Sequence, residues 1–391
     1  MSSSFDVVVI GGGVVGLSAA LSMHQRGYSV ALFDASDGAV VSRVYAINQA
    51  SIALFTALGI WPLMDKTRVP SYEKIHVWDA ASGGAIDFDA RMIGRSHLGF
   101  ILEEASIKDA LWVEIRKKDI DAFKKTRMTS VTLAEDGVII SDGTSEWHGK
   151  LMIVADGARS AMRDLLNVAV TGWPYHQEAL VTTVATEKPH LSTAYQVFHQ
   201  TGPLAFLPLA DGHQCSIVWS AAPTTVKTLM ALSDAPFEQA LAKAFEEKLG
   251  SCQLIGNRSR FPLSMRHAKV YSGRHWLLMG DAAHTIHPLT GLGLNLGLAD
   301  LTSWLALLDA AKTPVFSTKM LGAYQRERKH AVWTLIALIE GLKAFFANPL
   351  PPVTFLRGVL LNACDQLPPL KRFFIKQATG SDIFDKGVVP D

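Results

Sequence analysis

A glycine-rich turn near the N-terminus carries the first pattern with chemical meaning. Gly11, Gly13 and Gly16 have the spacing G-x-G-x-x-G, and Asp34 follows eighteen residues after Gly16, at the end of a second apolar run. Such glycines let a pyrophosphate approach the N-terminus of the next helix, where N–H groups and the helix dipole favour an anion. A carboxylate after the next strand accepts hydrogen bonds from a ribose. The pattern predicts a dinucleotide site, with a plain structural turn as the alternative, and leaves NAD and FAD open.

Two later stretches place an aspartate directly after an apolar strand. Asp156 lies in VADGARSAMR, and Gly280 and Asp281 lie in LLMGDAAHTIHPLTGLGLNLGLAD. An aspartate at such a position either binds the ribityl chain of a flavin or only caps a helix. The loop from Pro288 to Gly293 has no charged residue, which suits backbone N–H groups that stabilise negative charge on a reduced flavin. No second G-x-G-x-x-G follows a strand, and these features together favour FAD.

Residues able to move a proton or to contact a substrate form a weaker pattern. The sequence shows no Ser/His/Asp or Cys/His set for nucleophilic catalysis, and a flavin enzyme does not need one. The acid–base candidates are His284, His287 and Tyr175, for which loop or capping roles are the simpler alternative. The candidates for substrate contact are Tyr175, Phe206, Pro208 and Trp219, for which packing in the core of a sheet is the alternative.

The glycine turn requires a strand before it and a helix after it, and the hydrophobic pattern predicts both. Residues 6–10 and 29–34 have the apolar character of buried parallel strands, and residues 16–27 have helical spacing. Further along the chain we expect helices over 43–63, 101–118, 293–310 and 318–346, strands within 70–97, and an antiparallel sheet over 172–265 interrupted by one helix near 225–249.

The resulting fold class is α/β: a split Rossmann-like FAD-binding domain, an inserted antiparallel β-sheet substrate domain and a helical C-terminal segment. The expected FAD-binding domain comprises residues 1–70, 98–171 and 266–320, the substrate domain residues 71–97 and 172–265, and the helical region residues 321–391.

Composition excludes several classes of function. The 37 Lys and Arg residues balance 36 Asp and Glu residues, so a field that would bind nucleic acid is not expected. The three cysteines are too far apart in sequence to form a zinc site or a disulfide framework, which fits a reducing compartment. We see no uncharged apolar run of about 18 residues and no export signal, so the expectation is a cytoplasmic protein without a spanning helix.

The C-terminal stretch from 332 to 380 is apolar at helical spacing and is broken by prolines. Basic residues interrupt it, as in LKRFFIK. One interpretation is that these helices pack over the FAD-binding domain. The other is a monotopic membrane patch or a docking surface for a partner protein.

Taken together and in this order, the motifs resemble the flavoprotein aromatic hydroxylases, the group that includes para-hydroxybenzoate hydroxylase, and especially the ubiquinone-biosynthesis branch. The similar segments include VVVIGGGVVG, ADGARSAMR, FPLSMRHA and GDAAHTIHPLTGLGLNLGLAD, within residues 5–330. The resemblance implies bound FAD, transient NADPH or NADH, and O2 as co-substrate. It further implies that a C4a-hydroperoxyflavin hydroxylates the ring of a polyprenyl phenol or benzoquinol.

The resemblance also assigns residues. It implies that Gly11, Gly13 and Gly16 hold the FAD diphosphate, Asp34 the ribose, Arg43 the pyrophosphate, Asp156 both FAD and NADPH, and Gly280 and Asp281 the ribityl and diphosphate, while Pro288, Gly291, Gly293 and Asn295 frame the flavin ring. Two departures are notable. Leu292 stands where the branch usually has glutamine, and Glu104 stands where it usually has asparagine.

The resemblance implies a hydrophobic, prenylated aromatic substrate and a peripheral position on the inner face of the cytoplasmic membrane, with a membrane surface or a ubiquinone-biosynthesis complex as partner. Three alternatives stay open: a hydroxylase of a small soluble aromatic, a reductase of the geranylgeranyl type, and a non-catalytic FAD-fold scaffold or lipid-binding protein. The ring position, the tail length and the choice between NADPH and NADH also stay open.

Overall fold

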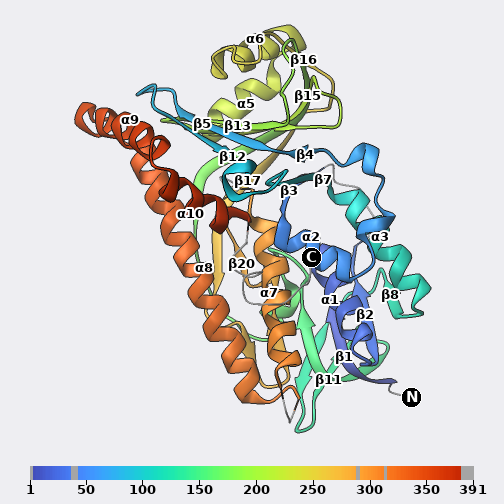
Figure 1. Cartoon of the computed structure of the whole chain (residues 1–391). Coiled ribbons are helices and arrows are strands. Elements are labelled where there is room, and N and C mark those ends of the chain that lie inside the picture. The colour runs from blue at the N-terminus through green and yellow to red at the C-terminus, as the bar shows by residue number, and fades with distance from the viewer. Residues whose placement is uncertain (1–2, 37–42, 288–290, 312–314, 380–391) are drawn as a thin grey trace.

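The glycine turn joins a buried strand to a helix, as the sequence predicts. The structure is a computed structural model that describes residues 3–36, 43–287, 291–311 and 315–379, without the side chains of 373 and 376–379 (Figure 1). β1 (Ser3–Ile10), α1 (Val14–Gln25) and β2 (Val30–Asp34) form a βαβ unit in which the two strands are parallel. Residues 7–9 of β1 are fully buried, as expected for a strand covered on both faces.

β1 and β2 lie in an eight-stranded sheet. Its main order is β18-β19-β11-β1-β2-β8, and β10 joins β11 to β9. From β19 to β8 the neighbouring strands are parallel. The other strands of this sheet are β8 (Asp121–Lys124), β9 (Ser130–Leu133), β10 (Val138–Ser141), β11 (Glu146–Val154), β18 (Ser272–Gly273) and β19 (Trp276–Leu278).

A nine-stranded sheet forms the second layer, in the order β20-β17-β12-β15-β14-β13-β5-β6 with β16 on β12. Its strands are β5 (Lys74–Asp79), β6 (Ala85–Asp89), β12 (Val170–Thr186), β13 (Thr193–His199), β14 (Gly202–Pro208), β15 (Gln214–Ala221), β16 (Cys252–Leu254), β17 (Ser259–Ala268) and β20 (His284–Thr285). The expected antiparallel pairing holds except between β5 and β13, which are parallel. Where β12 pairs with β17, its register shifts between Pro174 and Glu178.

A small third sheet contains residues that the sequence analysis assigned to two helices. It contains β3 (Val44–Asn48), β7 (Gly99–Glu103) and β4 (Ser71–Tyr72). The predicted helices over 43–63 and 101–118 therefore begin later than expected. Residues 44–48 pair with 99–103 across the fold, and this long-range pairing outweighs their local helical spacing.

The helices of the chain flank these sheets. They are α2 (Gln49–Ala57), α3 (Glu104–Lys117), α4 (Ala161–Leu165), α5 (Pro223–Ala231), α6 (Asp234–Ala244), α7 (Gly293–Asp309), α8 (Thr318–Ala347), α9 (Pro351–Asp365) and α10 (Pro368–Thr379), with 3-10 turns at Trp61–Leu63, Lys66–Arg68, Ala90–Ile93 and Gly280–Ala282. The single helix expected near 225–249 is two helices, because Leu232 and Ser233 are extended between α5 and α6.

The fold class predicted from the sequence is confirmed: several sheets and flanking helices form an α/β architecture with a helical C-terminal segment. In Figure 1, α8 runs along one flank of the molecule, α9 projects at its far end and α10 turns back. The division of the chain into domains at the stated boundaries stays a prediction.

One helix bears on the expectation that no segment spans a membrane. α8 is long and apolar enough to cross a membrane, with a mean hydropathy of 1.4 in its most apolar window, of which 22% is buried. Seven Lys, Arg and Glu residues lie along α8, but at most two fall within this window, so they do not lower its mean hydropathy below that of a spanning segment. This property alone is weak evidence for a spanning helix, because core helices of soluble proteins share it.

Candidate functional site

The predicted cofactor loops gather because they follow neighbouring parallel strands. Gly11 follows β1, Asp34 ends β2, Asp156 follows β11, and Gly280 follows β19. Since these strands are parallel neighbours, their carboxyl ends lie at one edge of the sheet. Ligands of open α/β sheets bind at that edge.

The glycine turn fits a bound pyrophosphate. Gly11 has a φ of +117°, and a Cβ there would overlap the carbonyl oxygen of Ala155. A Cβ on Gly16 would overlap the carbonyl oxygen of Gly11, so α1 can approach the turn only with glycine at this position. Gly13 is the N-cap of α1 and provides no side-chain hydrogen bond to the first turn. The first N–H groups of α1 can therefore bind an anion.

Asp34 lies directly beside this turn. Its carboxylate occupies the place of a Cβ on Gly12, so only glycine leaves room for it. The carboxylate accepts hydrogen bonds from the backbone N–H of Ser36, at 3.1 Å, and from the Ser36 hydroxyl, at 2.7 Å. The geometry suits an acid that turns toward the hydroxyl groups of a ribose.

A charged cluster surrounds Asp281. Burial among protein atoms raises the pKa of Asp281, although its side chain keeps an exposed surface, while His284 and Arg43 act in the opposite direction. The exposed surface is the part of this carboxylate that a ligand can reach. Burial alone would lower the pKa of Arg43, but Tyr45, Glu104 and Asp281 raise it.

The cluster also contains Glu104, the acid that stands where the resembling branch usually has asparagine. The hydroxyl of Tyr45 donates a hydrogen bond of 3.1 Å to Glu104, whose charge also raises the pKa of Asp281. Glu104 therefore lies within the electrostatic surroundings of the predicted pyrophosphate residues Arg43 and Asp281. Its negative charge opposes a second anion there and attracts the Arg43 guanidinium.

The Gly280–Asp281 turn is fixed from behind by a buried carboxylate. Asp300 of α7 accepts hydrogen bonds from the backbone N–H of Gly280 at 2.9 Å and from Arg328 of α8 at 2.7 Å, and it contacts His284 Nε2 at 2.7 Å. Burial would raise the pKa of Asp300, but His284 and Arg328 hold it below its usual value. Gly280 has a φ of +59°, the left-handed region that favours glycine.

Asp300 and Arg328 were missed by the sequence reasoning. The signal for Asp300 was an acid in the interior of a helix whose only other charged residue is Asp309 at its last position, since buried acids need partners. Arg328 had no comparable signal, because only the packing of α8 on α7 brings it to Asp300.

The loop that follows leads into the N-terminus of α7. Gly291 has a φ of +61° and lies 3.6 Å from the Ala46 side chain, measured from an ideal Cβ. Gly293 begins α7, whose N-cap residue Leu292 provides no side-chain hydrogen bond. Among the described residues, no N-cap side chain binds the first-turn N–H groups of α7, and their contact with a flavin stays a prediction. Pro288 lies outside the described residues.

Asn295 contacts protein groups rather than an open site. Its amide donates to the Ala46 carbonyl at 2.7 Å, and its carbonyl oxygen accepts from the Asn48 N–H at 3.0 Å and the Ser51 hydroxyl at 2.9 Å. It therefore holds the start of α7 against β3 and α2. Its predicted place near the flavin ring stays a prediction.

The Asp156 loop provides an unsatisfied polar atom. One carboxylate oxygen accepts from the Met162 N–H at 3.1 Å, and the other is buried with no partner among the described residues. Burial raises the pKa of Asp156. Arg163 donates to the carbonyls of Ala158 and Ala282, at 3.2 and 3.1 Å, and so links this loop to the Asp281 turn.

The acid–base candidates separate into two groups. His284 is directed at Asp300, as described above. His287 is fully buried, contacts Gln177 at 3.2 Å and meets the Tyr175 ring edge to face at 4.8 Å. Burial, with Lys343 nearby, lowers the pKa of His287 to about 3. The Tyr175 hydroxyl donates a 2.7 Å hydrogen bond to Glu340 of α8, and burial together with Glu340 raises the pKa of Tyr175.

The aromatic substrate candidates lie elsewhere. Phe206 and Trp219 pack in the core formed by the nine-stranded sheet with α5 and α6, where Phe206 stacks on Phe245 at 3.6 Å. Pro208 is buried at the end of β14. The structure does not bring Phe206 and Trp219 to Tyr175, and it shows for them the core packing that was the alternative.

The opposite face of the same strands is a better candidate for substrate contact. Ala205 and Leu207 alternate with Phe206 along β14, and Ala205 pairs with Val218, which pairs with Val181. These four residues are half-buried. Leu207 belongs to the hydrophobic cluster that includes Ala46, the neighbour of Gly291. Because side chains alternate along a strand, the sequence could have predicted that these residues share one face. Only the tertiary structure shows which face lies toward the predicted cofactor loops.

Comparison with known proteins identifies the family of this chain. The family described as "FAD binding domain" matches residues 4–338. The chain belongs to this family of FAD-binding proteins. It is therefore a flavoprotein. The hydroxylases among its relatives show that it is a flavin-dependent hydroxylase.

The relatives extend over nearly the whole chain. A protein named 3-demethoxyubiquinol 3-hydroxylase, from Escherichia coli, is 31% identical over 96% of this chain and 98% of its own length. Ubiquinone hydroxylase UbiL from Rhodospirillum rubrum is 30% identical over 96% of this chain and 90% of its own. Among solved structures, p-nitrophenol 4-monooxygenase PnpA from Pseudomonas putida has a TM-score of 0.79, 18% identity, and coverage of 97% of this chain and 99% of its own. These comparisons confirm the resemblance and the cofactor predicted from the motifs.

Proposed function

We propose that this chain is a FAD- and NAD(P)H-dependent monooxygenase that hydroxylates the aromatic ring of a polyprenyl phenol or benzoquinol in ubiquinone biosynthesis. The observation that carries the proposal is that the four strand-end loops lie at one edge of the sheet, while an apolar, half-buried sheet face shares a hydrophobic cluster with Ala46, the neighbour of Gly291. The full-length relatives named as ubiquinone hydroxylases support the substrate class.

The residues present fit FAD. The N-terminus of α1 would hold the pyrophosphate, Asp34 a ribose, and Arg43 and Asp281 the diphosphate and ribityl chain. The buried unpaired oxygen of Asp156 would accept a hydrogen bond from the cofactor. When bound, FAD supplies the redox chemistry, taking electrons from NAD(P)H and activating O2.

The chain itself would position the ring and exclude water. The apolar face with Val181, Ala205, Leu207 and Val218 would cover the substrate, since an apolar wall keeps water from the reacting atoms. His287 is neutral at physiological pH because its pKa is lowered to about 3, so it would orient groups by hydrogen bonding and not by charge. We assign His284 a positioning role through Asp300.

We further propose that the protein works on the inner face of the cytoplasmic membrane, alone or within a complex of ubiquinone-biosynthesis proteins. A prenylated substrate resides in the bilayer, so the enzyme must reach it there. The apolar C-terminal segment supports this proposal.

The test is spectroscopic and then chemical. The purified protein should show flavin bands near ~370 and ~450 nm that NADPH bleaches without air and that return in air. A prenylated phenol should then gain one oxygen atom and increase NADPH consumption. Hydroxylation of only the phenol without a tail would support a hydroxylase of small soluble aromatics. NADPH consumption without any O2 requirement would support a reductase. A protein that does not bind FAD would overturn the proposal and leave a scaffold.

A further inference from the structure

The C-terminal helices expose a long surface without charge. The structure describes every residue from 333 to 369, and no exposed residue among them is charged. Several are large and apolar, including Phe355 at 75% exposure and Leu350 at 58%. Charged residues are 19% of the chain and normally lie at the surface. We call the exposed residues of 333–369 the apolar C-terminal surface.

The charged residues of this segment are directed inward and paired. Glu340 of α8 accepts the hydrogen bond of Tyr175, and Lys343 lies 3.5 Å from the centre of the Tyr175 ring and 4.0 Å from Glu340. Asp365 at the end of α9 forms a 2.6 Å ion pair with Lys371, whose side chain is 8% exposed. Charge is therefore present in the segment, but each group is neutralised away from the outer face.

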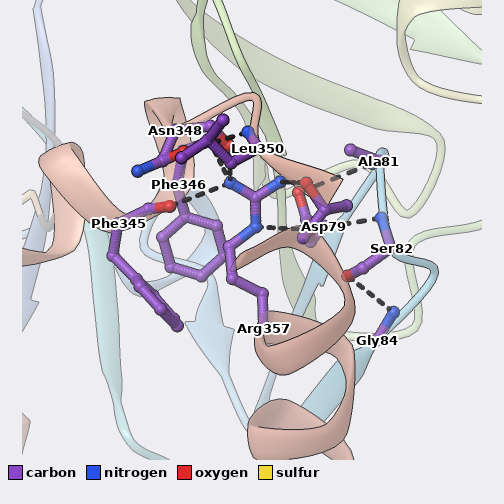
Figure 2. A network of polar contacts seen from close by, with 10 residues as sticks. Asp79, Ala81, Ser82, Gly84, Phe345, Phe346, Asn348, Leu350 and Arg357 are labelled. Carbon is purple, nitrogen blue, oxygen red and sulfur yellow. Dashed lines mark hydrogen bonds and ion pairs between the residues drawn. The ribbon is translucent and has the colours of Figure 1, made fainter. Parts of the chain in front are cut away.

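Arg357 shows the same arrangement most clearly (Figure 2). Its side chain is fully buried and forms a 3.0 Å ion pair with Asp79 at the end of β5. It also donates to the carbonyls of Phe345, Phe346 and Asn348, at 2.8, 2.7 and 3.0 Å, where α8 ends. Four carbonyl and carboxylate contacts around one guanidinium fix the corner between α8 and α9.

The fixed corner determines which face of α9 points outward. Gly358 packs so closely on the β5–β6 turn that a Cβ on Gly84 would lie 2.6 Å from its Cα. This contact and the Arg357 ion pair direct the polar side of α9 inward. Phe355, Leu356, Val359 and Leu360 remain exposed on the other side of the helix, which projects from the molecule in Figure 1.

Neighbouring features favour lipid over a protein partner. Protein interfaces usually have a polar rim, whereas the exposed polar residues between 333 and 369 are only Thr334, Asn362 and Gln366, none of them charged. Exposed basic residues flank the surface instead, with Arg326 and His330 before it and Arg372 after it, accompanied by one exposed acid, Glu327. Apolar helices with basic ends are typical of segments that lie in a bilayer interface with anionic headgroups.

A hollow beside α9 is equally free of charge. It has a volume of about 640 Å³ and is lined by uncharged residues that include Ala81, Gln200, Phe355 and Val359. Ser82, Thr354 and Asn362 also line it, and an anionic or cationic ligand would lack a counter-charge there.

We propose that the apolar C-terminal surface docks on an anionic lipid bilayer, with α9 lying in the interface and held in that orientation by the Arg357–Asp79 ion pair. This inference rests on the proposed function, which places the substrate in the membrane. It assigns the contact to a specific helix and a specific ligand class, an anionic phospholipid surface.

The test compares vesicle binding of the purified, FAD-loaded full-length chain with that of two variants. Phe355→Asp combined with Leu360→Asp places two charges on the docking face. Ile255→Asp is the matched control. Ile255 is also exposed, at 52%, but it directly follows β16 and lies far from this segment in sequence. Binding is measured by co-sedimentation with phosphatidylglycerol–phosphatidylethanolamine vesicles and with phosphatidylcholine vesicles. FAD content and unfolding temperature of each variant show that it is folded.

We expect the wild type and Ile255→Asp to bind the anionic vesicles, and the double variant to bind about tenfold more weakly, since charges are costly in the interface. Absence of wild-type binding, or equal binding of the double variant, would overturn the proposal. The proposal would also be overturned if the wild type is a dimer, the double variant is a monomer and neither binds vesicles. The surface would then join two copies of the chain. Hydroxylation of a prenylated phenol in detergent is measured separately, so that failure of docking and failure of the proposed activity are distinguishable.

Discussion

Gly11 and Gly280 begin two of the predicted cofactor loops, and both have a backbone conformation that L side chains rarely adopt. At Gly11 the surrounding strands add a second constraint, because a Cβ would overlap the neighbouring chain. The backbone conformation of these loops therefore requires glycine, which has no side chain. The same holds for Gly297, where α7 passes 3.0 Å from the Cα of Gly280, measured from an ideal Cβ.

Gly11→Ala should abolish FAD binding. The left-handed backbone costs roughly 1–2 kcal/mol with a side chain, and the overlap with Ala155 would displace the loop that must contact the pyrophosphate. The measurement is the ratio of flavin to protein absorbance after purification. Gly143→Ala is the control, since Gly143 also has positive φ, +96°, but lies in an exposed turn. If both variants keep FAD, the close contact at Gly11 is not required.

His287 should make the protein less stable below neutral pH. Its pKa is about 3 in the folded protein and about 6.5 in the unfolded chain, so only the unfolded chain binds the proton between these values. Stability is complete above pH 6.5 and falls as pH decreases toward 3, by up to about 1.4 kcal/mol per pH unit.

The check is denaturant unfolding at pH 6.5 and 5.0. Compared with the wild type, His287→Asn should lose about 2 kcal/mol less stability over this interval, because the titrating group is gone. His330→Asn, at an exposed histidine, is the control and should behave as the wild type. Equal losses in wild type and His287→Asn would show that another group accounts for the pH dependence.

At the scale of elements, α8 is joined to the cofactor loops at two places. Arg328 reaches Asp300 and, through it, the Gly280 turn, while Glu340 reaches Tyr175 beside His287. The helix that leads to the apolar C-terminal surface therefore also supports both ends of the 280–287 segment. This connection is a feature of packing, since its partners are far apart in sequence.

Asp300→Asn should weaken FAD binding without removing any group that touches the cofactor. The variant leaves Arg328 buried without its counter-charge, which typically costs about 3–5 kcal/mol. FAD fluorescence titration and denaturant unfolding would both report the loss. Glu103→Gln is the control, because its ion pair with Arg68 is solvent-exposed and is worth at most about 1 kcal/mol. Unchanged FAD affinity in Asp300→Asn would remove the positioning role from this carboxylate.

The corner between α8 and α9 offers a pairwise test. Arg357→Met and Asp79→Leu should each destabilise the protein by about 3–5 kcal/mol, because each leaves the other charge buried and unpaired. The double variant should lose less than the sum, since no charge remains buried. Hydrogen exchange should show the loss first in α9. Strictly additive losses would mean that the two side chains do not act as a pair.

At the scale of the whole molecule, α8 connects the 280–287 segment to the apolar C-terminal surface, so activity should depend on where the substrate resides. With a long-tailed phenol in anionic vesicles, Phe355→Asp with Leu360→Asp should lower kcat/KM by about tenfold, because fewer enzyme molecules reach the bilayer. With a short-tailed phenol in solution, kcat/KM should match the wild type. A loss with both substrates would place these residues in the reaction itself.

The sequence alone determined the βαβ unit and the dinucleotide loop, and the order of its motifs indicated the family. The βαβ unit and the loop are local: a glycine spacing, an apolar run and an acid at a fixed distance describe a strand, a turn and a helix N-terminus without help from the rest of the chain. The same local pattern predicted helices that begin too early at 43 and 101. Pairing between β3 and β7 joins residues more than fifty positions apart, which no local pattern contains.

Only the tertiary structure decided which side chains meet. It directed Phe206 and Trp219 into the core and turned the other face of their strands toward the cofactor loops. It also brought Arg328 to Asp300 and Arg357 to Asp79. The physical reason is that burial and charge pairing depend on distance in space. The sequence does not show whether a charged residue in an apolar helix faces water or forms a buried ion pair. Only the packing of the helix distinguishes these two environments.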